Sequence, residues 1–134
     1  MFRTLLVEDN TSFRKILKDD LESEFPSMEI IEAGDGTEAL EKIGSSPPNL
    51  IFMDIRLPGK NGLELTRMIK ADHPEITVIV LTSYDLPEYR EAAVRYKADY
   101  FFSKGSIASD EIADLVKSIL LQKGFKGNGA NAGS

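Results

Sequence analysis

The chain has 134 residues, 42% of them hydrophobic and 28% charged, which predicts one ordered globular domain and excludes a disordered chain. It has no cysteine, so disulfides and thiolate metal sites are excluded, and we expect a cytoplasmic protein. A net charge of −6 with scattered Lys and Arg argues against direct nucleic-acid binding, and the apolar runs are far shorter than the ~20 residues of a membrane span.

Five short apolar runs, most of them rich in β-branched or aromatic residues, predict β-strands. They lie at residues 5–7, 30–31, 50–53, 76–81 and 100–102. A helical spacing of apolar residues follows each predicted strand. These helical segments lie within residues 13–21, 39–43, 65–69, 89–96 and 112–120.

Polar residues mark where three of these helices should begin. Asp35 with Glu38 and Asp85 with Glu88 have the spacing of capping boxes, and Ser109 precedes two acidic residues. Five strands that alternate with five helices predict a parallel sheet with right-handed crossovers, and the near-continuous apolar strands predict that helices cover both of its faces.

The C-terminal segment has a different composition from the rest of the chain. After residue 122 it is rich in Gly, Asn and Ala and shows no apolar period. We therefore expect one domain over residues 1–124, followed by a flexible tail or a truncated linker at 125–134.

Polar side chains close four of the five predicted strands. Glu8 and Asp9 follow the first strand, Asp54 the third and Thr82 the fourth, and Lys104 follows the fifth. In an open parallel sheet the carboxyl ends of all strands share one edge, and ligands bind where the strand order reverses. With the order 2-1-3-4-5 that point lies between strands 1 and 3, so these side chains should converge there.

Each of these residues taken alone has an ordinary structural explanation as a turn, cap or solvated surface residue. Together they place three carboxylates on one edge, and such groups repel one another unless they are protonated or paired. A divalent cation resolves this conflict. Oxygen ligands without a nearby His or Cys favour Mg²⁺, for which Mn²⁺ could substitute, and the single histidine, His73, is interpreted as a helix-end residue.

The same grouping predicts a reaction. A carboxylate can attack phosphorus and form an aspartyl phosphate, while Mg²⁺, a lysine ammonium and a hydroxyl neutralise and align the phosphoryl oxygens. Asp54 ends the central strand and is the predicted nucleophile. Glu8 and Asp9 are adjacent on the first strand and are better arranged to share the metal.

At this point the chain resembles the receiver domains of two-component response regulators over residues 3–122. The matching segments are Leu-Leu-Val-Glu-Asp-Asn at 5–10, Met-Asp-Ile-Arg-Leu-Pro-Gly at 53–59, Asn-Gly at 61–62, Val-Leu-Thr-Ser at 80–83 and Ala-Asp-Tyr-Phe-Phe-Ser-Lys at 98–104. The resemblance implies a flavodoxin-like, doubly wound α/β fold with a five-stranded parallel sheet. It also implies phosphorylation by a histidine kinase or phosphotransfer protein, an output domain or target protein that reads the phosphate, and homodimers through the last two helices.

Carried over by position, the resemblance implies roles for the acidic residues. Asp54 would accept the phosphoryl group, Asp9 would bind the metal directly, and Glu8 would act through water. Arg56 would add its backbone carbonyl to the metal. Arg56 and Tyr84 would also flank the acyl phosphate and limit the approach of water.

The resemblance implies further roles on the opposite side of the site. Thr82 and Lys104 would hold the phosphoryl oxygens, and Phe101 would be the aromatic switch that turns inward when Thr82 swings toward the phosphate. Three positions depart from the usual family pattern. Phe101 lacks the hydroxyl of a Tyr, so it can fill a pocket but cannot make the hydrogen bond of a Tyr. Gly105 stands where a proline commonly forms a cis bond, so the loop there should differ, and Glu8 replaces the commoner Asp.

Three alternative functions account for these residues less well. A receiver-like interaction module that is never phosphorylated has no need of all five site residues. An aspartate-nucleophile phosphohydrolase has a second Asp where this chain has Arg56, so we expect no enzyme activity beyond the domain's own phosphorylation and slow self-dephosphorylation. Flavin binding needs a phosphate-cradling loop after the first strand, where acidic Glu8 and Asp9 stand instead.

Overall fold

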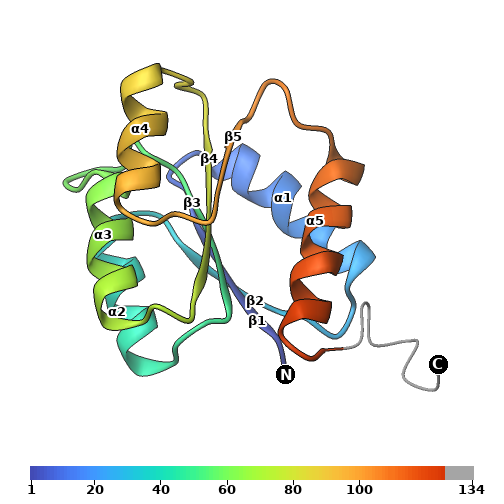
Figure 1. The fold of residues 1–134 in the computed structure, drawn as a ribbon. Helices are drawn as coiled ribbons and strands as arrows, with labels where there is room; N and C mark the ends of the chain where they lie inside the picture. The colour runs from blue at the N-terminus through green and yellow to red at the C-terminus, as the bar shows by residue number, and fades with distance from the viewer. Residues whose placement is uncertain (126–134) are drawn as a thin grey trace.

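The computed structural model describes residues 1–125, in which five strands alternate with five helices (Figure 1). The strands are β1 (Arg3–Val7), β2 (Glu29–Ala33), β3 (Leu50–Met53), β4 (Thr77–Thr82) and β5 (Tyr100–Ser103). The helices are α1 (Thr11–Glu24), α2 (Gly36–Ser45), α3 (Gly62–Asp72), α4 (Pro87–Arg95) and α5 (Ser109–Gln122). The predicted alternation is confirmed, with element ends that shift by a few residues.

All neighbouring strands pair in parallel, in the order β2-β1-β3-β4-β5. Leu5 in β1 lies opposite Ile31 of β2 on one side and opposite Ile51 of β3 on the other. The predicted doubly wound fold is therefore confirmed. The strand order reverses beside β1 and β3, so their carboxyl ends border the crevice where ligands bind in such sheets.

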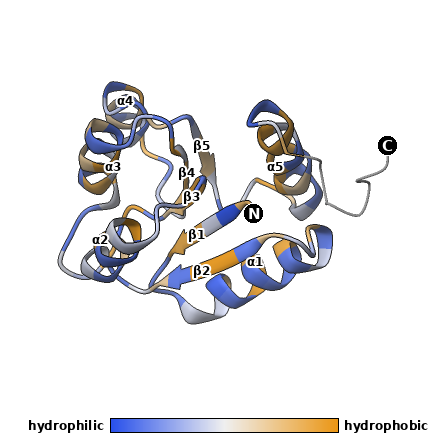
Figure 2. Cartoon of the chain, turned by 90° about the horizontal axis from the view of Figure 1, so that it is seen from below, coloured by the Kyte–Doolittle hydropathy of each residue, from blue (hydrophilic) through white to orange (hydrophobic). Residues whose placement is uncertain are grey.

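Helices α1 and α5 cover one face of the sheet, and α2, α3 and α4 cover the other (Figure 1). Alternate strand residues enter two separate cores, so that Leu6 and Phe52 face α1 and α5 whereas Leu5 and Ile51 face the opposite layer. Figure 2 shows the apolar strands enclosed between helices whose outer surfaces are largely hydrophilic. Burial on both faces explains why the strands are continuously apolar rather than alternating with polar residues.

The predicted helix starts have different outcomes. Asp35 caps α2 as expected, because its side chain accepts a 2.8 Å hydrogen bond from Glu38 N. The capping box predicted at Asp85 is wrong, since α4 begins at Pro87 and has no side-chain cap. The Asp85 carboxylate instead pairs with the Arg90 guanidinium, a stronger, charge-assisted partner than a backbone N–H group.

The last helix is tied to the rest of the domain at both ends. Ser109 is its first residue, and the Ser109 hydroxyl hydrogen-bonds Asp20 of α1 at 3.0 Å. After the helix, Gly124 has a left-handed φ of +85°, and the Phe125 ring packs edge-on against Phe2 with centroids 5.1 Å apart. The rest of the tail predicted at 125–134 lies outside the described residues. Within residues 1–125, every helix is too short or too polar to traverse a bilayer.

Candidate functional site

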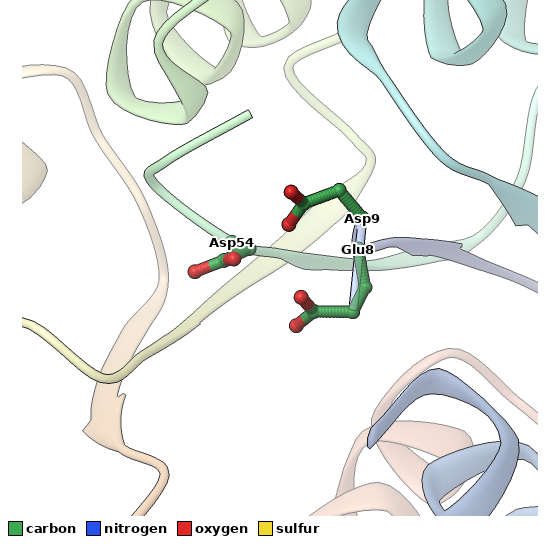
Figure 3. Close-up of side chains that lie close together, drawn as sticks. All are labelled: Glu8, Asp9 and Asp54. Atoms are coloured by element: carbon green, nitrogen blue, oxygen red, sulfur yellow. The ribbon is translucent and has the colours of Figure 1, made fainter. Parts of the chain in front are cut away.

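Three carboxylates meet where β1 and β3 end (Figure 3). Glu8 and Asp9 follow β1 and Asp54 follows β3, and one carboxylate oxygen of each lies within 4.8 Å of the others. The strand register brings them together, because Val7 lies opposite Met53 and Asp54 N donates a 3.0 Å hydrogen bond to Val7 O. The acidic cluster expected at this edge of the sheet is therefore present.

The three carboxylates differ in their surroundings. Glu8 and Asp54 are buried, with 4% and 6% of their surface exposed, whereas Asp9 is exposed. Lys104 Nζ lies 2.6 Å from Glu8 Oε1 and 3.6 Å from Asp54 Oδ2. Burial raises the pKa of Glu8 to about 7 despite the Lys104 hydrogen bond, and the Asp54 charge adds to the increase.

This donor set fits a hard divalent cation. A single lysine ammonium faces two buried carboxylates and leaves the exposed Asp9 carboxylate without a cationic partner among the described residues. Each residue offers carboxylate oxygens only, which are the ligands that Mg²⁺ prefers. A cation shared by the three groups would remove their mutual repulsion.

Backbone hydrogen bonds orient the two buried carboxylates. Asn10 N donates to Glu8 Oε2 at 3.1 Å, and the Arg14 side chain of α1 donates to the Glu8 carbonyl oxygen. Ile55 N donates to Asp54 Oδ1 at 2.9 Å, which leaves Oδ2 directed toward Lys104. The strand-end pattern did not predict these contacts of Asn10 and Arg14 with Glu8, because they depend on how α1 packs beside the edge of the sheet.

Gly62 lies directly against the backbone that carries Asp54. A Cβ atom on Gly62 would stand 1.8 Å from the Asp54 carbonyl oxygen, a distance that no side chain can occupy. Gly62 N also donates to Ile55 O at 2.8 Å, which closes the loop between β3 and α3. The glycine is thus required for the close approach that positions Asp54.

Thr82 and Lys104 lie at the same edge of the sheet. Thr82 is fully buried at the end of β4, and its Oγ1 accepts a 3.1 Å hydrogen bond from Tyr84 N. Lys104 N donates to Thr82 O at 2.8 Å, and the Lys104 ammonium also lies 4.5 Å from the centroid of the Phe13 ring. The structure therefore brings together the side chains of Glu8, Asp9, Asp54 and Lys104, and it places Thr82 at the end of β4, beside the backbone of Lys104.

The remaining sequence-selected residues have other partners. The Arg56 guanidinium lies 4.0 Å from the centroid of the Tyr84 ring, so these two side chains form one pair. Phe101 lies farther away, in β5 opposite Val80, where it is half-buried. Gly105 follows Lys104 with an ordinary trans bond, since residues 1–125 contain no cis peptide.

Comparison with known proteins assigns the chain to a family. A family model described as the response regulator receiver domain matches residues 4–117. Chemotaxis protein CheY of Halobacterium salinarum is 32% identical over 118 residues, covering 88% of this chain and 96% of that protein. Transcriptional regulatory protein HptR of Staphylococcus aureus is 34% identical over 131 residues, covering 95% of this chain and 51% of that protein.

A longer relative agrees with this assignment. A protein-glutamate methylesterase/protein-glutamine glutaminase of Geobacillus kaustophilus is 40% identical over 106 residues, covering 78% of this chain and 30% of that protein. This chain therefore spans about half, or less, of the length of HptR and of the methylesterase.

Among solved structures, a CheY-like receiver domain protein of Methanospirillum hungatei has a TM-score of 0.85 and 28% identity, covering 92% of this chain and 96% of that one. TrrA of Thermotoga maritima, solved in complex with Mg²⁺ and BeF, has a TM-score of 0.79 and 36% identity, covering 90% and 100%. Because the family model covers most of the chain and CheY aligns along nearly its whole length, this protein belongs to the response regulator receiver domain family of two-component systems.

Proposed function

We propose that this domain accepts a phosphoryl group on Asp54 from a histidine kinase or phosphotransfer protein, in a Mg²⁺-dependent reaction, and relays it as a conformational change. The observation that carries the proposal is the acidic cluster of Glu8, Asp9 and Asp54 within 4.8 Å, with Lys104 Nζ 3.6 Å from Asp54 Oδ2. The TrrA complex with Mg²⁺ and BeF, in a relative of the same fold, supports the same chemistry.

The residues at the edge of the sheet would bind the metal in different ways. Asp9, which is exposed, would bind Mg²⁺ or Mn²⁺ directly together with Asp54, and Glu8 would act through water. Arg56 would contribute its backbone carbonyl. When bound, the cation supplies positive charge to the phosphoryl oxygens during transfer.

Asp54 Oδ2 is the proposed nucleophile, because Oδ1 is held by Ile55 N. A bond forms between Oδ2 and phosphorus while the bond from phosphorus to the donor histidine nitrogen breaks, and the donor histidine leaves with the bonding electron pair. Lys104 and Thr82 would stabilise the negative oxygens of the transferred group. The buried position of Asp54 limits the access of competing water.

The relay begins at Thr82. In the resting structure the Thr82 hydroxyl oxygen accepts a hydrogen bond from Tyr84 N. A phosphoryl oxygen on Asp54 would accept a hydrogen bond from the same hydroxyl, and a turn of the side chain toward the phosphate would draw its oxygen away from Tyr84 N. Movement of the hydroxyl would vacate space into which Phe101 turns. Burying a ring is worth on the order of 1.5–3 kcal/mol, which is enough to change a two-state population by tenfold or more.

The proposal also covers the extent of the domain, its location in the cell and its partners. The receiver domain would span residues 1–124 in the cytoplasm, where a cysteine-free chain is suited to the reducing environment. Because HptR and the methylesterase are longer than this chain, the proposal includes an output domain or target protein that reads the phosphate. The family resemblance adds homodimers through α4 and α5. Direct nucleic-acid binding by the domain is disfavoured by its charge of −6.

The activity would be limited to the domain's own phosphorylation and slow self-dephosphorylation. A phosphohydrolase of the aspartate-nucleophile kind needs a general acid two residues after the nucleophile, and Arg56 stands there.

Intact-mass measurement after incubation with acetyl phosphate and Mg²⁺ tests the proposed function. We expect one phosphoryl adduct on the wild type and on Asp72→Ala, which removes an exposed carboxylate at the end of α3. Asp54→Ala should show no adduct, and EDTA should prevent it in the wild type. An adduct that persists in Asp54→Ala refutes the acceptor assignment, and no adduct on the wild type favours an interaction module that is never phosphorylated.

A further inference from the structure

The Phe101 ring is covered by a cation from a neighbouring element. The Arg90 guanidinium, on α4, lies 4.7 Å from the centroid of this half-buried ring. A guanidinium above an aromatic face is attracted by the negative charge of the ring face. The contact exists only while the ring stays in its present position, so it stabilises that position.

A bidentate ion pair holds Arg90 in place. Arg90 Nε donates to Asp85 Oδ1 at 2.6 Å, and Arg90 Nη2 donates to Asp85 Oδ2 at 3.1 Å. The two bonds fix the plane of the guanidinium, which a single contact would not do. This use of Asp85 explains why it does not cap α4, although its spacing from Glu88 matches a capping box.

Asp85 lies close to Thr82 in the chain. The loop between β4 and α4 begins immediately after Thr82, and its backbone is tied to the Thr82 hydroxyl by the hydrogen bond from Tyr84 N. Asp85 is the next residue after Tyr84. A movement of the Thr82 hydroxyl would therefore release the backbone that carries the Asp85 carboxylate.

Helix α4 is attached to the domain by few buried groups. Of its nine residues, Ala93 alone is buried, and no side chain caps its N-terminus. An uncapped, shallowly packed helix is free to shift at small cost in stability. Besides Ala93, the half-buried Tyr89 and Ala92 pack against the core, and the Arg90–Phe101 contact adds a link from the first turns of α4 to β5.

From these contacts we infer that Asp85 and Arg90 form a clamp that holds Phe101 in its resting position and sets how readily the domain switches. This inference rests on the proposed function and adds two positioning residues to it. Phosphorylation of Asp54 would release the clamp through Thr82 and the backbone of Tyr84. The stronger the clamp, the smaller the fraction of unphosphorylated molecules with Phe101 turned inward.

The size of the effect follows from the exposure of the clamp. The side chains of Arg90 and Asp85 are 50% and 39% exposed, so solvent screens their ion pair. A cation over a ring at such a site changes a population ratio by about two- to fivefold. Because a ligand that selects the switched state binds in proportion to the fraction already switched, its apparent affinity should change by the same factor.

NMR of the protein with ring-labelled phenylalanine tests the clamp, with Phe101→Leu used to assign the Phe101 resonance. Spectra are recorded with Mg²⁺ alone and with Mg²⁺ and beryllofluoride, a mimic of the phosphoryl group. In Arg90→Ala and in Asp85→Asn, the Phe101 resonance with Mg²⁺ alone should move toward its beryllofluoride position. Both variants should bind beryllofluoride about two- to fivefold more tightly than the wild type.

Arg95→Ala is the matched control, because Arg95 is also on α4 but lies 5.4 Å from the centroid of the Tyr96 ring instead. It should leave the Phe101 resonance and the beryllofluoride affinity at their wild-type values. Suppose that the wild type responds to beryllofluoride. If the Phe101 resonance with Mg²⁺ alone is then unmoved in Arg90→Ala and Asp85→Asn, or shifts equally in Arg95→Ala, the clamp is wrong and the proposed function stands. A wild type that does not respond to beryllofluoride refutes the proposed function as well.

Discussion

The Lys104 ammonium forms a 2.6 Å ion pair with the Glu8 carboxylate. Asp54 Oδ2, the proposed nucleophile, lies 3.6 Å from the same nitrogen, so the lysine is shared unequally between the two buried acids. Since burial raises the pKa of Glu8 to about 7, a nearby positive charge favours its ionised form. We expect that a cation beside Glu8 leaves Lys104 free to turn toward a phosphoryl group on Asp54.

The first prediction concerns metal affinity. Asp9→Asn should weaken Mg²⁺ binding by about tenfold or more, because it removes a charged direct ligand, and Glu8→Gln should weaken it less. Isothermal calorimetry of the unphosphorylated protein measures both. The reverse order of the two variants would show that Glu8, and not Asp9, is the direct ligand.

The second prediction concerns the packing of Gly62 against Asp54. Gly62→Ala places a Cβ atom 1.8 Å from the Asp54 carbonyl oxygen, so the free energy of unfolding should fall by more than about 3 kcal/mol. Gly44→Ala, in α2 with no atom within 4 Å of the new Cβ, is the control and should be neutral or stabilising by up to about 1 kcal/mol. Urea unfolding measures both, and similar stabilities would show that the loop after β3 relaxes freely.

The third prediction concerns pH. Burial opposes ionisation of Glu32, but hydrogen bonds from Lys18 and Arg14 outweigh it and lower the pKa of the carboxyl in the folded state. Its contribution to stability is therefore present above the unfolded pKa of about 4.5 and is lost as the pH falls through the lower, folded value.

Glu32→Gln removes this contribution at every pH. Between pH 5 and pH 3 the wild type should lose up to about 1 kcal/mol more stability than Glu32→Gln, a small value because the group is partly exposed. Urea unfolding at several pH values measures the difference. Parallel pH profiles for the two proteins would mean that the ion pairs contribute nothing.

The fourth prediction concerns the lifetime of the phosphate. Tyr84 and Arg56 form one pair, with the guanidinium 4.0 Å from the ring centroid, and together they should limit the approach of water to an acyl phosphate on Asp54. Tyr84→Ala should shorten the half-life of the phosphorylated protein severalfold. Tyr84→Phe keeps the ring and should retain the wild-type half-life. If the half-life is unchanged in Tyr84→Ala, the pair does not shield the phosphate.

The fifth prediction concerns the relay from Thr82. Thr82→Ala should remain phosphorylatable on Asp54 but lose the coupling to Phe101, because it has no hydroxyl to move toward the phosphate. Thr82→Ser keeps the hydroxyl and should retain the coupling. Amide NMR shifts in α4 and β5 on phosphorylation measure it, and a response in Thr82→Ala as large as in the wild type would exclude this relay.

Much of this fold is determined by local sequence patterns. The period of the apolar residues distinguishes strands from helices. The strict alternation of strands with helices along the chain predicts a parallel sheet. The carboxyl ends of parallel strands share one edge, so the position of Glu8, Asp9, Asp54, Thr82 and Lys104 in the chain was enough to predict that they meet. The structure places the side chains of Glu8, Asp9, Asp54 and Lys104 together in that way, with Thr82 at the end of the neighbouring strand β4.

Other relationships were decided only by the tertiary structure, because they join groups whose sequence spacing carries no signal. The 1.8 Å approach of Gly62 to Asp54 depends on how the loop after β3 folds back on the strand. The choice of Asp85 between capping α4 and pairing with Arg90 depends on the competing partners available in the folded chain. A local spacing states which bonds a side chain can make, whereas the three-dimensional neighbours determine which bond has the lower free energy.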